Sequence, residues 1–129
     1  MATRDTTTRE IPPESWIDFF DEFSRRHQGW LVDVEVLGSL GAQFEAEQVP
    51  LQGISADHAN KDISITLALP ANKIVEHFVA HPAKVRVEEL GGAEGAIQIE
   101  SAEGETTLVT FRSAMPPEML DGLLPGQAG

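Results

Sequence analysis

Apolar and polar residues alternate along most of the chain from Trp30 onward, and this period of two constrains the fold more than any other feature. Trp30, Val32, Val34 and Val36 share one face of a strand, while the acidic residues between them face the other way. Further runs typical of strands are residues 41–49, 50–55, 63–69, 84–90, 96–101 and 107–112. The pattern predicts about seven strands.

The connections between these runs are short and polar, which favours antiparallel pairing because parallel neighbours need a long crossover. The last connection makes a finer prediction. If Val109 and Phe111 share a face with Ile97 and Ile99, the loop between the two strands must have an odd length, with Gly104 at positive φ.

Residues 11–27 (IPPESWIDFFDEFSRRH) carry a different period, that of an amphipathic helix. The two prolines suit its first turn, and Gly29 suits its end. At 100° per residue one side is apolar, and it is made of Trp16, Ile17, Phe19, Phe20 and Phe23, with His27 beside them. We therefore predict an α+β fold, in which one N-terminal amphipathic helix packs on a curved antiparallel sheet or small barrel of about seven strands.

The length of 129 residues suits one domain. We expect a disordered N-terminus over residues 1–10, a single α+β domain over 11–112 and a partly ordered C-terminal tail over 113–129. The start lacks the apolar segment of a signal peptide, no run approaches the ~20 apolar residues of a membrane span, and cysteine is absent. A cytoplasmic location fits these features.

The net charge of −12, from 21 acidic and 9 basic residues, disfavours two classes of partner. A surface of this sign repels phosphate backbones and anionic lipids. We expect neither nucleic-acid nor membrane binding.

A small basic cluster, Arg25 to His27, closes the helix. Arg25 follows Asp21 by four residues, and Arg26 follows Glu22 by four, the spacing of ion pairs on one helix. The cluster is therefore predicted to finish the helix and not to bind an anion.

The segment EHFVAH holds two histidines whose chemistry depends on secondary structure. On a helix, His77 and His81 would lie about 6 Å apart and could share a metal ion. On a strand they would lie roughly 13 Å apart, too far for one ion. The many β-branched residues favour the extended form. A metal site would also need a third ligand, which His58 or Asp57 would have to supply.

No pattern of nucleophile and base marks a catalytic site. The chain has no G-x-S-x-G, and its neighbouring acids are typical of a solvated face. We assign no catalytic residues and no cofactor, and the sequence favours a protein without enzymatic activity, while leaving an enzyme open.

The tail contains a brief apolar patch in the motif PPEMLDGLL. It is a candidate for docking on a partner protein and consists of Met119, Leu120, Leu123 and Leu124.

Several separated stretches resemble a known family in order: IPPESW, FSRRHQGWLVDVEVLG, GAQFEAEQVPLQGISAD, HPAKVRVEE and IESAEGETTLVTFRSAMPPEMLDG. Together they resemble the small bacterial family of unknown function DUF5335 over Ile11 to Gly122. The resemblance implies a bacterial, cytosolic, stand-alone domain. It brings no catalytic residues, because no activity is assigned to the family.

The sequence thus predicts a non-catalytic binding or protein-interaction module that forms a homo-oligomer or docks on a protein partner. The alternative is a small metal- or ligand-binding protein or enzyme that uses His58, His77 and His81. The ligand, the partner and the oligomeric state are not specified by these patterns.

Overall fold

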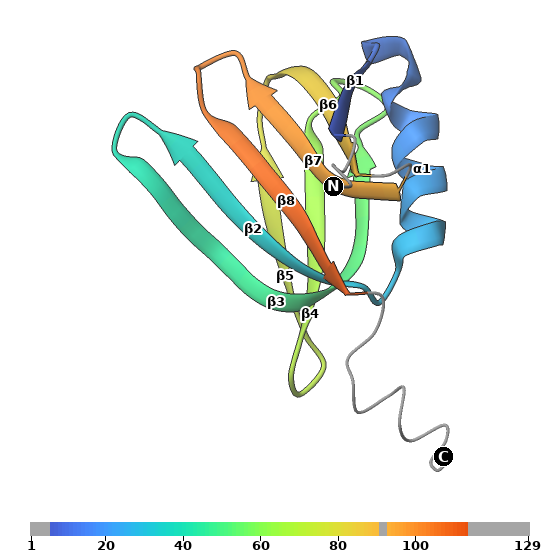
Figure 1. The fold of residues 1–129 in the computed structure, drawn as a ribbon, viewed down its shortest axis with the longest axis vertical. Helices are drawn as coiled ribbons and strands as arrows, with labels where there is room; N and C mark the ends of the chain where they lie inside the picture. Colours follow the sequence, from blue (N-terminus) through green and yellow to red (C-terminus); the bar gives the residue numbers. More distant parts are fainter. Residues whose placement is uncertain (1–5, 91–92, 114–129) are drawn as a thin grey trace, which may run out of the picture.

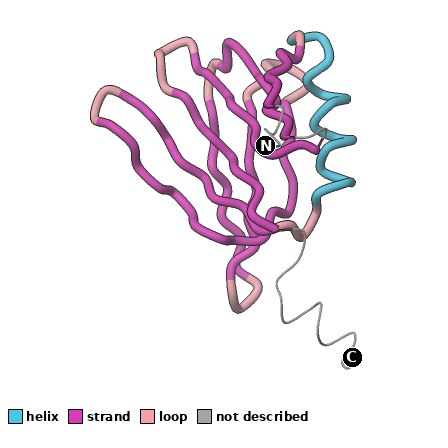
Figure 2. Tube along the Cα trace, viewed as in Figure 1, coloured by secondary structure: helices cyan, strands magenta, loops and turns pink. Residues whose placement is uncertain are grey.

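The computed structural model describes residues 6–90 and 93–113, which form a mostly β structure with one short helix (Figures 1 and 2). All strand pairs are antiparallel, and the strand order is β1-β6-β7-β8-β2-β3-β4-β5. The elements are β1 (Thr6–Ile11), a 3-10 turn η1 (Pro13–Ser15), α1 (Trp16–His27), β2 (Leu31–Gly38), β3 (Gly41–Ala56), β4 (Ile63–Leu69), β5 (Lys73–Val79), β6 (Pro82–Leu90), β7 (Ala93–Ser101) and β8 (Thr106–Ser113). The α+β class and the antiparallel sheet are confirmed, whereas residues 6–90 and 93–113 form eight strands in a sheet that is not closed.

Three differences from the prediction explain the new count. Residues 6–10, which belong to the N-terminus predicted to be disordered, form β1 together with Ile11 and pair with β6. The runs 41–49 and 50–55 are one strand, β3. The ambiguous segment before His81 is β5, as the β-branched residues favoured. Residues 1–5 and 114–129 lie outside the described residues.

The long strand β3 belongs to two parts of the sheet. Up to Pro50 it pairs with β2, and from Leu51 onward it pairs with β4. We call residues 51–56 of β3 together with β4 and β5 sheet B, and the other strands sheet A. In Figure 1, β4 and β5 lie behind the strands of sheet A. The sheet therefore curves around its core.

Alternation places one face of nearly every strand in this core, as the sequence predicts. Ile97 lies opposite Val109, and Gly104 in the loop between β7 and β8 has a φ of 99°, so the predicted odd loop is confirmed. The buried apolar side chains from both sheets form one cluster, which includes Val32, Val34, Leu51, Ile54, Ile63, Ile65, Leu67, Val85, Val87, Ile97, Ile99 and Val109.

Helix α1 covers the open side of this curved sheet with its apolar stripe. Phe20 and Phe23 are fully buried, and the Trp16 indole donates a hydrogen bond of 2.8 Å to the Ile11 carbonyl of β1. Ile17 and Phe19 are partly buried against the same core. The predicted packing of the amphipathic helix is confirmed.

Candidate functional site

Sheet B has two edges, and the edge formed by β3 is covered by α1. The Ser24 hydroxyl accepts a hydrogen bond from the Ile54 amide and donates one to the Ile54 carbonyl, both at 2.8 Å. The segment after the helix adds two more bonds of 2.8 Å, because Leu51 donates to the Trp30 carbonyl and Gly29 donates to the Leu51 carbonyl. Helix and loop thus replace the missing neighbouring strand.

The other edge of sheet B is β5. This strand pairs with β4 from Ile63–Val79 to Leu69–Lys73, and no other strand within residues 6–90 and 93–113 pairs with it. Because hydrogen bonding in an antiparallel pair alternates along the strand, every second residue of β5 directs its backbone N–H and C=O away from β4. This edge has the geometry needed to accept a further strand.

Three large apolar side chains are exposed on this edge strand. Ile74 is 58% exposed, Val75 43% and Phe78 55%. Their neighbours on β4 explain the exposure: Ala68 lies opposite Ile74 and Ser64 opposite Phe78, and these small side chains cover little of the larger ones. The outer face of β5 therefore exposes Ile74 and Phe78, with Glu76 between them, beside an open backbone edge. Val75 is exposed on the opposite face.

The strand at the opposite end of the sheet, β1, is protected in the usual way. Its exposed positions include Thr7, Thr8, Arg9 and Glu10, and Arg9 pairs with Glu89 on β6 at 3.3 Å. Charged side chains on an edge discourage pairing with other chains. β5 also carries two exposed charged residues, Lys73 and Glu76, but it differs from β1 in the large apolar side chains that it exposes.

A cleft of about 210 Å³ adjoins the C-terminal half of β5. It is lined by residues 77–80 and, from the β7–β8 hairpin, by Ser101, Glu103, Glu105 and Thr107. The two carboxylates make this end of the edge acidic.

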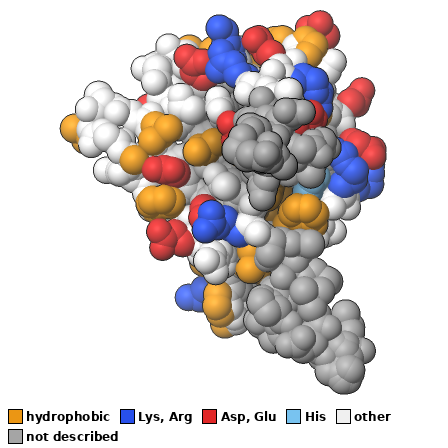
Figure 3. Space-filling view, in the orientation of Figure 1, with side chains coloured by type: hydrophobic (Ala, Val, Ile, Leu, Met, Phe, Trp, Pro, Cys, Tyr) orange, Lys and Arg blue, Asp and Glu red, His pale blue; other side chains and the backbone are white. Residues whose placement is uncertain are grey.

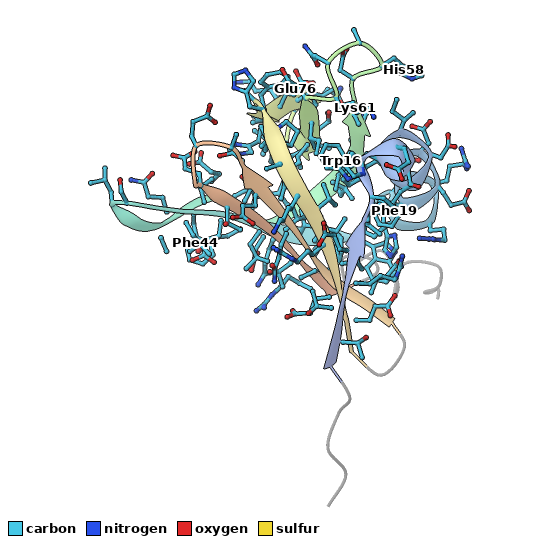
Figure 4. The ribbon with its side chains drawn as sticks, turned by 90° about the horizontal axis from the view of Figure 1, so that it is seen from above. Trp16, Phe19, Phe44, His58, Lys61 and Glu76 are labelled. Atoms are coloured by element: carbon cyan, nitrogen blue, oxygen red, sulfur yellow. The ribbon has the colours of Figure 1, made fainter. Side chains whose placement is uncertain are left out.

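The three predicted histidines do not meet. His58 lies in the loop after β3, apart from Glu76 on β5 (Figure 4). His77 faces the cleft, and His81 follows the strand. In the part of the chain that the structure describes, no group of three or more histidines or acids is placed to hold a metal ion. The metal hypothesis therefore gains no support from these residues.

His81 has a structural explanation. It takes a φ of 53° at the corner where the chain passes from β5 to β6, a conformation uncommon for residues other than glycine. Its amide donates to Asp62 at 3.1 Å, its carbonyl accepts from Ala102 at 2.8 Å, and its ring lies 3.1 Å from the Glu103 carboxylate. These contacts fix the corner.

The loop that carries His58 is held by Asp57. The Asp57 carboxylate accepts backbone hydrogen bonds from Ala59 at 2.9 Å and Asn60 at 3.0 Å. These two bonds hold the pKa of Asp57 below its usual value, and the bond from Asn60 has the larger effect.

The basic cluster at the end of α1 is structural, but its partners differ from the prediction. Arg25 pairs with Glu22 at 2.6 Å, one turn back, and Arg26 pairs with Glu94 of β7 at 3.1 Å. The predicted pairs at a spacing of four are wrong, because Arg25 pairs at a spacing of three and the fold brings Glu94 to Arg26. His27 is buried there: its Nδ1 lies 2.9 Å from the Phe23 carbonyl and its Nε2 lies 3.5 Å from Glu94.

A second group of exposed apolar residues lies on the projecting β2–β3 hairpin. It comprises Leu37, Phe44 and Leu40, the last 89% exposed. Figure 3 shows hydrophobic side chains over this region with acidic ones among them, and Figure 4 shows Phe44 pointing away from the body. Strand β2 of the hairpin is paired on both sides, but residues 41–50 of β3 pair with β2 alone within the described residues. This second open edge carries the exposed acids Glu45 and Glu47, which follow Phe44 along the strand.

The predicted docking residues Met119, Leu120, Leu123 and Leu124 lie outside the described residues. Sequence reasoning missed β5 as a site, although a signal was present: in KIVEHFV apolar residues occupy both faces, Ile74 and Phe78 on one and Val75 and Val79 on the other. A strand of this kind is apolar on the side that faces away from the core as well.

Comparison with known proteins places the chain in a family. The model of the family of unknown function DUF5335 matches residues 7–120. The chain belongs to this family. The resemblance found in the sequence is thereby confirmed.

One relative of the DUF5335 chain is an uncharacterized protein of Aquifex aeolicus, 30% identical over 110 residues, which are 84% of this chain and 96% of the relative. No solved structure matches. Within the described residues, no helix has the length and apolar character to cross a membrane.

Proposed function

We propose that this protein is a non-catalytic interaction module that binds an extended segment of a partner protein along β5. In this mode the bound segment adds a strand to the sheet, its backbone supplies hydrogen bonds, and its side chains fill the surface beside the edge. The single observation that carries the proposal is the apolar, open edge formed by β5.

The contrast with the other edges supports this proposal. Exposed apolar edge strands promote unwanted pairing, and proteins usually cover or charge them. Here α1 and Ser24 cover the part of β3 that belongs to sheet B. The other two edge segments carry exposed charges: β1 has Arg9 and Glu10, and the part of β3 that pairs with β2 alone has Glu45 and Glu47. An edge that keeps Ile74, Val75 and Phe78 exposed is better explained by binding than by packing.

The proposal is tested with the double variant Ile74→Thr/Phe78→Thr, which removes the apolar surface and keeps strand-forming residues. Leu40→Thr, on the hairpin, is the matched control for loss of exposed apolar area. A partner captured on the wild-type protein is purified and its affinity measured, and hydrogen exchange locates its binding site.

We expect the double variant to bind at least tenfold more weakly, because two apolar contacts are lost. The control is expected to bind as the wild type does, and the partner is expected to slow exchange at residues 73–79. Equal affinity of the double variant, or protection confined to other strands, would contradict the proposal.

A further inference from the structure

The outward face of β5 has an order that restricts what pairs with it. Ile74, Glu76 and Phe78 share this face, so an acid stands between two apolar side chains. Glu76 lies opposite Thr66 of β4, and it takes part in none of the ion pairs of the described residues. Residues directly opposite in adjacent strands interact, and a like charge there is unfavourable.

Carboxylates predominate at the C-terminal end of the edge. Glu103 and Glu105 lie in the cleft beside His77 and Phe78, while Lys73, the cation of β5, is at the far end of the strand. The whole chain carries a net charge of −12. A negative surface speeds encounters with basic partners and slows those with acidic ones.

Two other occupants fit this edge poorly. A second copy that pairs Ile74 with Phe78 across a two-fold axis must place Glu76 opposite the Glu76 of the other copy. The chain's own segment 114–129 contains Glu118 and Asp121 and neither lysine nor arginine. Charge therefore favours a different chain.

We infer that the segment bound at β5 is basic, with an arginine or lysine opposite Glu76 and apolar side chains opposite Ile74 and Phe78. This inference rests on the proposed function and adds the chemistry of the partner. Backbone pairing accounts for binding along the edge, and Glu76 selects the charge of the residue that lies opposite it in the bound segment.

The test uses two synthetic peptides of nine residues and the full chain labelled for NMR. Both peptides carry valine at the positions that would face Ile74 and Phe78 and threonine elsewhere. One has a central arginine and the other a central glutamate. Titrations at about 150 mM salt suppress long-range attraction, so that local pairing decides the difference.

Wild-type protein is expected to bind the arginine peptide about fivefold more tightly than the glutamate peptide, and Glu76→Lys is expected to reverse this order. Glu45→Lys, which changes the net charge equally on the exposed part of β3, is the control and is expected to keep the wild-type order.

The outcomes separate the inference from the proposed function. If both peptides protect the β5 amides with equal affinity, the inference fails and the proposed function stands. If neither protects β5 at millimolar concentration, the proposed function fails with it. Protection of β5 in the free protein would assign the edge to another occupant and overturn the inference: a second copy if it depends on concentration, the chain's own segment if it does not.

Discussion

The two edges of sheet B differ in how their backbone groups are satisfied. Along β3, α1 lies on the edge and Ser24 bonds both polar groups of Ile54. Along β5, the small side chains of Ala68 and Ser64 lie opposite Ile74 and Phe78, and three apolar residues of the strand stay exposed. Sheet B thus has one edge that the chain itself covers and one that is open. Covering an edge requires a side chain such as Ser24 that can bond the free backbone groups, and no such residue is placed along β5 in the described part of the chain.

The largest expected effect distinguishes two phenylalanines, one at each edge. Phe20 on α1 is fully buried, so Phe20→Ala is expected to lower the free energy of unfolding by about 3–5 kcal/mol through lost burial and a cavity. Phe78→Ala on β5 is expected to change it by less than about 0.5 kcal/mol. Urea denaturation measures both. A comparable loss for Phe78→Ala would show that the outer face of β5 is not an exposed surface.

A smaller effect is expected at the covered edge itself. Ser24→Ala leaves the amide and the carbonyl of Ile54 without their partner, which is expected to lower the free energy of unfolding by about 2 kcal/mol. Ser55→Ala, an exposed serine on the same strand, is the control and should have almost no effect. If the two variants lose equal stability, the hydroxyl does not close this edge.

The smallest effect concerns the loop that leads from β3 to β4 and depends on pH. Two backbone amides lower the pKa of Asp57 in the folded state. The bonds therefore stabilise the fold above the usual pKa of 3.8, and this stabilisation is lost as the pH falls through the lower, folded value. Asp57→Asn is expected to weaken this dependence in thermal denaturation between pH 2 and about pH 6. An unchanged profile would rule out this role of Asp57.

Periodicity was sufficient to predict the body of the fold. The apolar stripe from Trp16 to Phe23 identifies α1 and its buried face, and alternation identifies the inward residues of β2, β4, β6, β7 and β8. The register between β7 and β8 followed from the odd loop at Gly104. In each case one face is buried, so the pattern is strong.

Prediction was weakest for the two strands at the ends of the sheet, where most side chains are exposed. β1 is polar because it is an exposed edge, and its threonines resemble a disordered terminus. β5 lacks a clear alternation because Ile74 and Phe78 lie on its outer face, so the sequence pattern did not distinguish a strand from a helix at the candidate site. The contact of Arg26 with Glu94 joins residues 68 positions apart, which local spacing does not reveal.

The central claim is that β5 is an open edge, and amide hydrogen exchange of the free protein tests it most directly. We expect slow exchange at Leu51 and Ile54, whose amides are bonded to Trp30 and Ser24, and fast exchange at every second residue of β5. Uniformly slow exchange from residue 73 to residue 79, comparable with that of Ile54, would contradict the account.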